Sequence, residues 1–132
     1  MVKEIESSIR VRVFRHIFHG TAWIMVACIV IQTAIAGMAV FADPAKWSWH
    51  TAFVHVFELV PLLMLIFAFV GKLSKALRWQ SFGLFVLIYL QYFTAHVPTA
   101  GLLHPVIALL LFWLSFRVAK KAWQFNKGRE SI

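Results

Sequence analysis

Acidic residues and cysteine are both scarce in this chain. Of its 132 residues only 5 are Asp or Glu, against 13 Lys and Arg, and charged residues make up 14%. A di-iron carboxylate centre needs several buried acids, whereas the apolar segments contain one, Glu58. The single cysteine, Cys28, excludes an intramolecular disulfide and a cysteine-based metal site.

Apolar residues, by contrast, make up 61% of the chain, and the mean hydropathy is +0.79. Soluble domains are nearer half apolar and a quarter charged, so the composition predicts a membrane protein. A membrane-spanning helix needs about 20 apolar residues, and four segments qualify: residues 18–41, 49–70, 79–97 and 102–123. Their short connections predict antiparallel neighbours. We expect an all-α, integral membrane, antiparallel four-helix bundle that forms a single domain over residues 1–132.

The basic residues are unevenly distributed between the connecting segments. Lys46 lies between the first two spans, and the other twelve lie in the N-terminal tail, the second connection and the C-terminal segment. Cytoplasmic loops carry an excess of Lys and Arg, so both termini are predicted to be cytoplasmic, in the inner (cytoplasmic) membrane. The basic residues behind the net charge of +8 are then expected to orient the protein in the membrane and to contact the lipid bilayer. No nucleic-acid partner is expected. The twelve are Lys3, Arg10, Arg12, Arg15, Lys72, Lys75, Arg78, Arg117, Lys120, Lys121, Lys127 and Arg129.

Polar residues of all four predicted helices gather in the outer half of the bundle. From the helical rise, His55 and Glu58 lie roughly 9 and 13 Å below the outer edge. Ionisable groups inside a membrane are costly and by default mark a functional site. The inner half offers only His16 and His19 at its edge, which we interpret as interface residues. The outer set comprises Gln32, His50, His55, Glu58, Gln91, Thr94, His96 and His104.

Imidazoles on facing helices of an apolar bundle are the usual way to hold a haem. His55 with His104 is the preferred axial pair, and His55 with His96 is the rival pair. Gln32, Gln91 and Glu58 are candidates for fixing ligand orientation, a role that such sites need. His50 and His96 are expected at the rim, where they can meet propionates or simply face the interface. The inner half lacks a facing histidine pair, so one haem b per chain is predicted.

Two other kinds of site use the same residues. His50, His55, His96, His104 and Glu58 could hold a copper, zinc or iron ion. Alternatively, a histidine and Glu58 could exchange protons with a quinol or quinone, with or without haem. A structural role is also open for His104, which precedes Pro105 and can cap the fourth helix.

The layout resembles small four-helix membrane b-type cytochromes and is similar to one half of haem A synthase. The residues that carry the resemblance are His55 on the second span and His104 in Leu103-His104-Pro105-Val106. Glu58 follows His55 by three positions, whereas in the synthase the glutamate precedes its histidine. The chain also resembles a family of small four-helix membrane proteins with a first-helix histidine such as His19 and the Leu-His-Pro-Val turn. The cytochrome resemblance implies haem ligation by His55 and His104.

The leading functional hypothesis is a membrane b-type haem protein that transfers electrons between quinol and a redox partner. The alternative is a non-enzymatic accessory or metal-handling membrane protein without haem. Whether the chain catalyses a reaction, and whether it forms a homo-oligomer, is left open by the sequence.

Overall fold

The computed structural model describes residues 1–130, which fold into helices and contain no β-strand. The prediction of an all-α fold is therefore confirmed over this part of the chain. The elements in order are α1 (Val2–Phe41), η1 (Pro44–Lys46), α2 (Trp47–Phe57), α3 (Val60–Val70), α4 (Lys75–His96), η2 (Pro98–Leu103) and α5 (His104–Glu130).

Three stretches are long and apolar enough to cross a membrane: Lys3–Phe41, Pro44–Val70 and Pro98–Gly128. They indicate a multi-pass membrane protein. The helix α4 has the required length, with 22 residues. It is less apolar, because its sequence includes Gln80 and Gln91. Of the four predicted spans, three are thus supported by length and composition together.

The second predicted span, residues 49–70, is not one continuous helix. It is divided into α2 and α3 by a turn at Glu58 and Leu59, directly before Pro61. Proline has no N–H and cannot bond to the carbonyl of the residue four positions earlier, here Phe57. The mean hydropathy does not reveal the interruption, because Pro44–Val70 as a whole is apolar enough to count as one span. It places Glu58 at a change of helix direction.

The first and last helices extend beyond their predicted spans. The helix α1 begins at Val2 instead of residue 18, so the basic N-terminal segment extends the first helix. The helix α5 begins at His104 and continues to Glu130, whereas the span was predicted for residues 102–123. Residues 127–130 are helical, and 131–132 lie outside the described residues.

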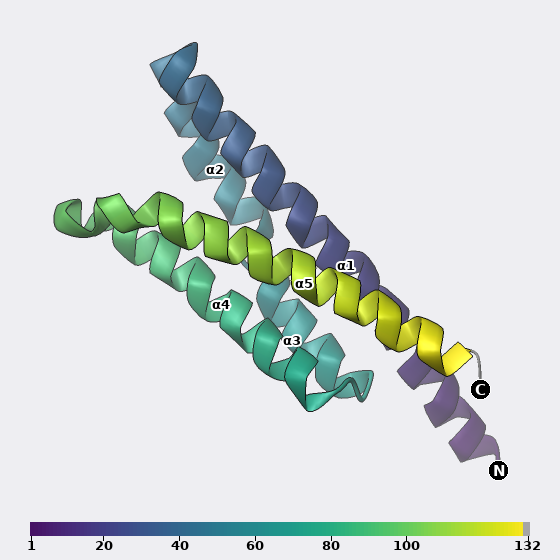
Figure 1. Cartoon of the computed structure of the whole chain (residues 1–132). Helices are drawn as coiled ribbons and strands as arrows, with labels where there is room; N and C mark the ends of the chain where they lie inside the picture. Colours follow the sequence, from purple (N-terminus) through teal and green to yellow (C-terminus); the bar gives the residue numbers. More distant parts are fainter. Residues whose placement is uncertain (131–132) are drawn as a thin grey trace.

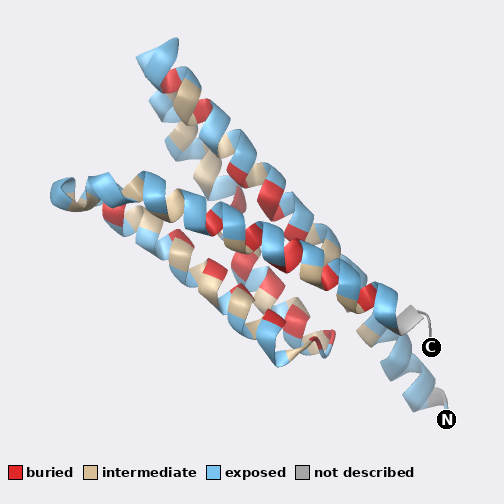
Figure 2. Cartoon of the chain, viewed as in Figure 1, coloured by how far each residue is buried: buried red, intermediate tan, exposed pale blue. Residues whose placement is uncertain are grey.

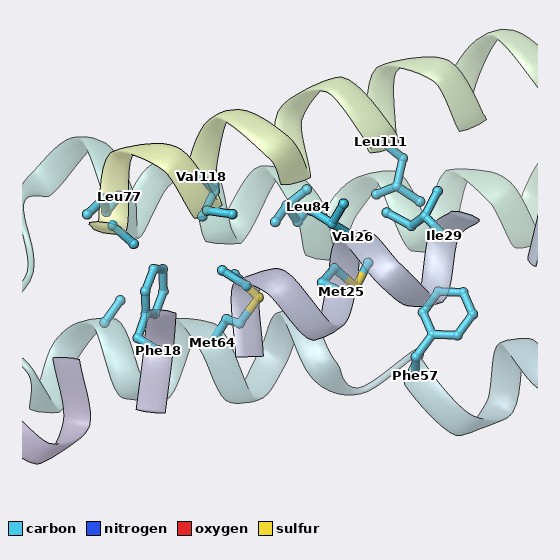
Figure 3. Packing of buried hydrophobic residues seen from close by; sticks show 14 of the residues in the cluster. Phe18, Met25, Val26, Ile29, Phe57, Met64, Leu77, Leu84, Leu111 and Val118 are labelled. Atoms are coloured by element: carbon cyan, nitrogen blue, oxygen red, sulfur yellow. The ribbon is translucent and has the colours of Figure 1, made fainter. Parts of the chain in front are cut away.

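The core is a stripe of apolar side chains between the helices. Its largest fully buried members include Phe18, Met25, Met64 and Leu84, and they interdigitate from α1, α3, α4 and α5 (Figure 3). The outward faces are also apolar but exposed, as Figure 2 shows along every helix. Large exposed apolar surfaces mark membrane or interaction faces, which agrees with helices that lie in lipid.

The helices diverge at the end that holds η1 and η2, here called the hairpin end. α1 packs against α5, α3 and α2, and α4 packs against α3 and α5, whereas α2 packs mainly against α1 and η1. In Figure 1 the first arm, α1 with α2, therefore separates from the second arm, α4 with α5, towards this end. The two arms consequently point apart at the hairpin end.

The opposite end, which holds both termini, is fastened by Arg15 of α1. Its Nε donates a hydrogen bond of 2.8 Å to the carbonyl of Gly71, directly after α3. Its own carbonyl accepts a bond of 3.3 Å from Nδ2 of Asn126 on α5, and its guanidinium lies 5.4 Å from the ring centre of Phe125. One residue thus joins three helices at this terminal end.

Candidate functional site

Four helices each contribute polar side chains to one cluster at the hairpin end. It comprises Gln32 from α1, His50 from α2, Gln91 and Thr94 from α4, and His104 from α5. Thr94 is buried and the other four are half-buried. We call these five residues the hairpin-end cluster.

Gln32 and His50 hold each other through two hydrogen bonds. Nε2 of Gln32 donates to the His50 carbonyl at 2.9 Å, and Nδ1 of His50 lies 3.2 Å from the Gln32 carbonyl. A carbonyl can only accept, so neutral His50 carries its proton on Nδ1 and presents a lone pair at Nε2. This is the tautomer in which a histidine can bind a metal through Nε2.

His104 is held by side chains of α4, but in the opposite tautomer. Its Nδ1 lies 3.1 Å from Oγ1 of Thr94. The Gln91 amide has one orientation in which both its nitrogen and its oxygen form hydrogen bonds. In this orientation its nitrogen donates to Nδ1 of His104 at 2.9 Å and to the His104 carbonyl at 3.1 Å, and its oxygen accepts from Ala108 N at 2.8 Å. With Gln91 as donor, the proton of a neutral His104 lies on Nε2. Thr94 Oγ1, already bonded to backbone carbonyls, offers an acceptor for Nδ1–H when Nε2 is needed as a ligand.

The rings of His50 and His104 lie close together, although their helices belong to different arms. Their ring centroids are 6.4 Å apart and their planes are inclined by 57°. Neither Nε2 has a hydrogen bond to any of the described residues. Beside them, Oε1 of Gln32 is buried and also lacks a partner within residues 1–130. Buried polar atoms are normally satisfied, so an orphaned one at a polar cluster points to a missing ligand or water.

A second cluster lies on the flank of the bundle, where α2 ends. His55 Nδ1 lies 3.3 Å from Oε1 of Glu58 and 3.3 Å from the hydroxyl of Tyr92. The same hydroxyl donates a short hydrogen bond to Oε2 of Glu58. The His55 side chain is 64% exposed, so this His55–Glu58–Tyr92 triad opens outwards rather than into the bundle. Tyr92 was not among the predicted site residues.

The structure therefore distributes the predicted ligands differently from the preferred pair. His104 lies with His50, and the interactions of His55 are with Glu58 and Tyr92. His96 is exposed and turns back to its own helix, with Nδ1 2.7 Å from the Tyr92 carbonyl. The pairings of His55 with His104 and with His96 remain predictions, and the geometry favours neither.

The helical register of α2 agrees with this arrangement. His50 and His55 are five residues apart, which places them about 140° apart around a helix of 3.6 residues per turn. His50 shares its face with Val54 and Phe57 at i+4 and i+7, and these two side chains belong to the core or pack against it. His55 is likewise followed by apolar residues at i+4 and i+7, Leu59 and Leu62. The register therefore agrees with the inward position of His50 but does not select it.

A bare metal ion would need more ligands than one cluster provides. No group of three or more His, Cys, Asp or Glu side chains able to hold an ion is found in residues 1–130. Zinc sites use three or four protein ligands. The hairpin-end cluster instead provides two imidazoles, which suffice only for a centre that brings other ligands with it.

No curated protein and no solved structure matches the chain. A family of unknown function, DUF6220, matches residues 32–100. The match begins at Gln32 and extends through α2, α3 and α4, so it includes every residue of both clusters except His104. By this match over more than half of its length, the chain belongs to the DUF6220 family.

Proposed function

We propose that the protein is a multi-pass membrane electron carrier that holds one haem b between His50 and His104. The single observation that carries the proposal is the separation of these two imidazole rings. Their helices, α2 and α5, belong to different arms, so one ligand would come from each arm.

The separation agrees with axial ligation of a haem iron from both sides. A metal–nitrogen bond of about 2.0 Å on each side, plus roughly 1.1 Å from nitrogen to ring centre, puts two opposed imidazole centroids about 6.2 Å apart. The rings of His50 and His104 are 6.4 Å apart. The inclination of 57° is also compatible, because each axial ring can rotate about its own metal–nitrogen bond.

The number of protein ligands favours haem over a bare ion. The porphyrin supplies four nitrogens and leaves two axial positions for the protein. Two histidines would fill them: Nδ1–H of His50 donates to the Gln32 carbonyl, and Thr94 Oγ1 would accept from Nδ1–H of His104 once Gln91 no longer donates to that nitrogen. Such hydrogen bonds orient the imidazole and set its tautomer, and their loss typically lowers metal affinity 10- to 100-fold. The metal-handling alternative lacks a third ligand at this cluster.

The surroundings of the pair also suit a haem. Ile29, Phe57 and Leu111 form the end of the core one or two helical turns below Gln32, His50 and His104 (Figure 3). An apolar floor excludes water and raises the cost of charge on the iron. Haem supplies one-electron redox chemistry, and filling both axial positions leaves no place for a substrate, so transfer of electrons is the activity expected.

Absorption spectra of single-histidine variants test the proposal. We would express the full chain with haem available, purify it in detergent, and record oxidised and dithionite-reduced spectra. We expect a sharp low-spin α band that is lost in His50→Ala and in His104→Ala and is retained in His55→Ala, the matched control. A protein without haem, or a band lost in His55→Ala but retained in His50→Ala, would overturn the assignment of the pair. Stoichiometric copper or zinc in a colourless protein would favour the metal-handling alternative.

The orientation in the membrane is part of the proposal and rests on the basic residues at the terminal end. With both termini cytoplasmic, η1 faces outwards and the turn between α3 and α4 faces inwards. In a Cys28→Ala background, a membrane-impermeant thiol reagent should label Ser48→Cys in intact cells and should not label Ala76→Cys. Both positions are exposed in the folded chain, so the reverse pattern would invert the topology.

A further inference from the structure

A groove separate from both clusters lies between α1 and α5 at the terminal end. It is a cavity of about 400 Å³ lined by His16, His19, Trp123, Asn126 and Lys127. The haem proposal uses none of these residues. We call this cavity the terminal groove.

Hydrogen bonds fix the polar groups that line the terminal groove. Nε2 of His19 accepts from the indole N–H of Trp23 at 3.0 Å, so a neutral His19 carries its proton on Nδ1 and can donate from there. Asn126 is 9% exposed, and its Nδ2 is bonded to the Arg15 carbonyl. Its Oδ1 is buried and has no partner among residues 1–130. An acceptor without a donor therefore lies beside the groove.

The charge at the mouth of the groove is positive. Lys127 is exposed, and its Nζ lies 5.5 Å from the ring centre of Trp123. Most basic residues of the chain lie at this end, where the acids are Glu4 and Glu6 on α1 and Glu130 on α5. Basic pockets between helices on the cytoplasmic side of membrane proteins bind anionic headgroups. An anion is thus the ligand class that fits.

An apolar track leads from the groove towards the middle of the bundle. Trp23 lies one turn beyond His19 on α1, and Phe116 lies two turns before Trp123 on α5. Their rings meet edge to face at 5.8 Å, and 40% and 39% of the two residues, respectively, are exposed. The seam between α1 and α5 thus offers a polar, basic groove that continues into an exposed aromatic surface. A soluble phosphate would contact only the polar, basic groove and not the aromatic surface.

We infer that the terminal groove binds the headgroup of an anionic phospholipid, with an acyl chain along Trp23 and Phe116. The phosphate oxygens accept from Lys127 and from Nδ1–H of His19, and the glycerol part of the headgroup lies beside Asn126 in the groove. Phosphatidylglycerol provides both the negative phosphate and the glycerol. The inference goes beyond the proposed haem function and does not depend on it.

Lipid titration of the full chain in detergent tests the inference. Native mass spectrometry and thermal unfolding would be followed while phosphatidylglycerol, phosphatidylcholine or inorganic phosphate is added. We expect saturable binding and a raised melting temperature with phosphatidylglycerol only. Lys127→Ala should weaken the binding about five- to tenfold, and Lys75→Ala, which removes a cation of the same end outside the groove, should leave it unchanged.

Several results would overturn the inference. Equal effects of phosphatidylcholine and phosphatidylglycerol would show that the anion is not recognised. Protection by millimolar inorganic phosphate alone would assign the groove to a soluble phosphate compound. If Lys127→Ala and Lys75→Ala weaken phosphatidylglycerol binding equally, the binding depends on overall surface charge and not on the groove. His19→Gln provides a second variant: it should weaken phosphatidylglycerol binding while the haem spectrum stays unchanged.

Discussion

Replacing Gln32 by leucine should make the protein more stable and leave its haem binding unchanged. Gln32 places one amide atom in a hydrogen bond to the His50 carbonyl and leaves the other, Oε1, buried without a partner in the described chain. Leucine has a similar size and no polar atom. The substitution therefore removes one interaction that stabilises the folded protein and one that costs stability.

The magnitudes decide the sign of the change. A typical intramolecular hydrogen bond contributes about 0.5–1.5 kcal/mol, and bonds between membrane helices average about 0.6 kcal/mol. An unsatisfied buried acceptor costs about 1–3 kcal/mol. The His50 carbonyl retains its helical acceptor role within α2. We therefore expect Gln32→Leu to raise the free energy of unfolding by about 1 kcal/mol. Haem affinity should stay unchanged, because Nδ1 of His50 bonds to the backbone carbonyl of residue 32, which leucine retains.

Equilibrium unfolding in mixed micelles, followed by circular dichroism, would measure stability, and absorbance titration would measure haem affinity. Gln80→Leu is the matched control: Gln80 also has a buried Oε1 without a partner in residues 1–130 but lies at the terminal end of α4. It should raise stability to a similar extent and leave haem affinity unchanged. A loss of 1 kcal/mol or more in haem-free Gln32→Leu would refute the reasoning, since Oε1 would then have a stabilising partner.

Two other substitutions test the packing. In Gly71→Ala the added Cβ would lie 2.9 Å from a backbone oxygen of the preceding helix and 3.3 Å from Arg15 N; it should cost about 1–3 kcal/mol of unfolding free energy. The control Gly37→Ala has no atom within 4 Å of the new Cβ, so its higher helix propensity should add about 0.5–1 kcal/mol; equal effects of the two would contradict the contact. Tyr92→Phe removes the hydroxyl that donates to Glu58 and should cost about 1–2 kcal/mol in the same unfolding assay. The haem spectrum of this variant should not change, and a changed spectrum would place the flank triad in the haem site.

Local rules largely determined which residues form helices. Runs of apolar residues, with short loops at Pro44 and Pro98, predicted four segments whose cores agree with the observed helices. The second segment was the exception. Pro61 is present in the sequence, but whether a proline only kinks a helix or divides it depends on the packing around it. Here the chain turns at Glu58, and α2 follows α1 while α3 joins the core.

The sequence also determined that polar side chains of four helices would lie near one end of the bundle. That result follows from the rise per residue alone, and it brought Gln32, Gln91 and His104 to comparable depth. The contact between Arg15 and Gly71 could not be derived in this way. These residues are 56 positions apart, and their meeting depends on how α1 and α3 pack.

Only the tertiary structure decided which histidine of α2 turns inwards. In a soluble helix the apolar stripe identifies the buried face, but the lipid-facing side of a membrane helix is as apolar as the core-facing side. Depth alone therefore favoured His55, which lies deeper along the span. Rotation of α2 about its axis is set by the packing of Phe57 and Val54, and it directs His50 towards His104 and His55 towards Glu58 and Tyr92.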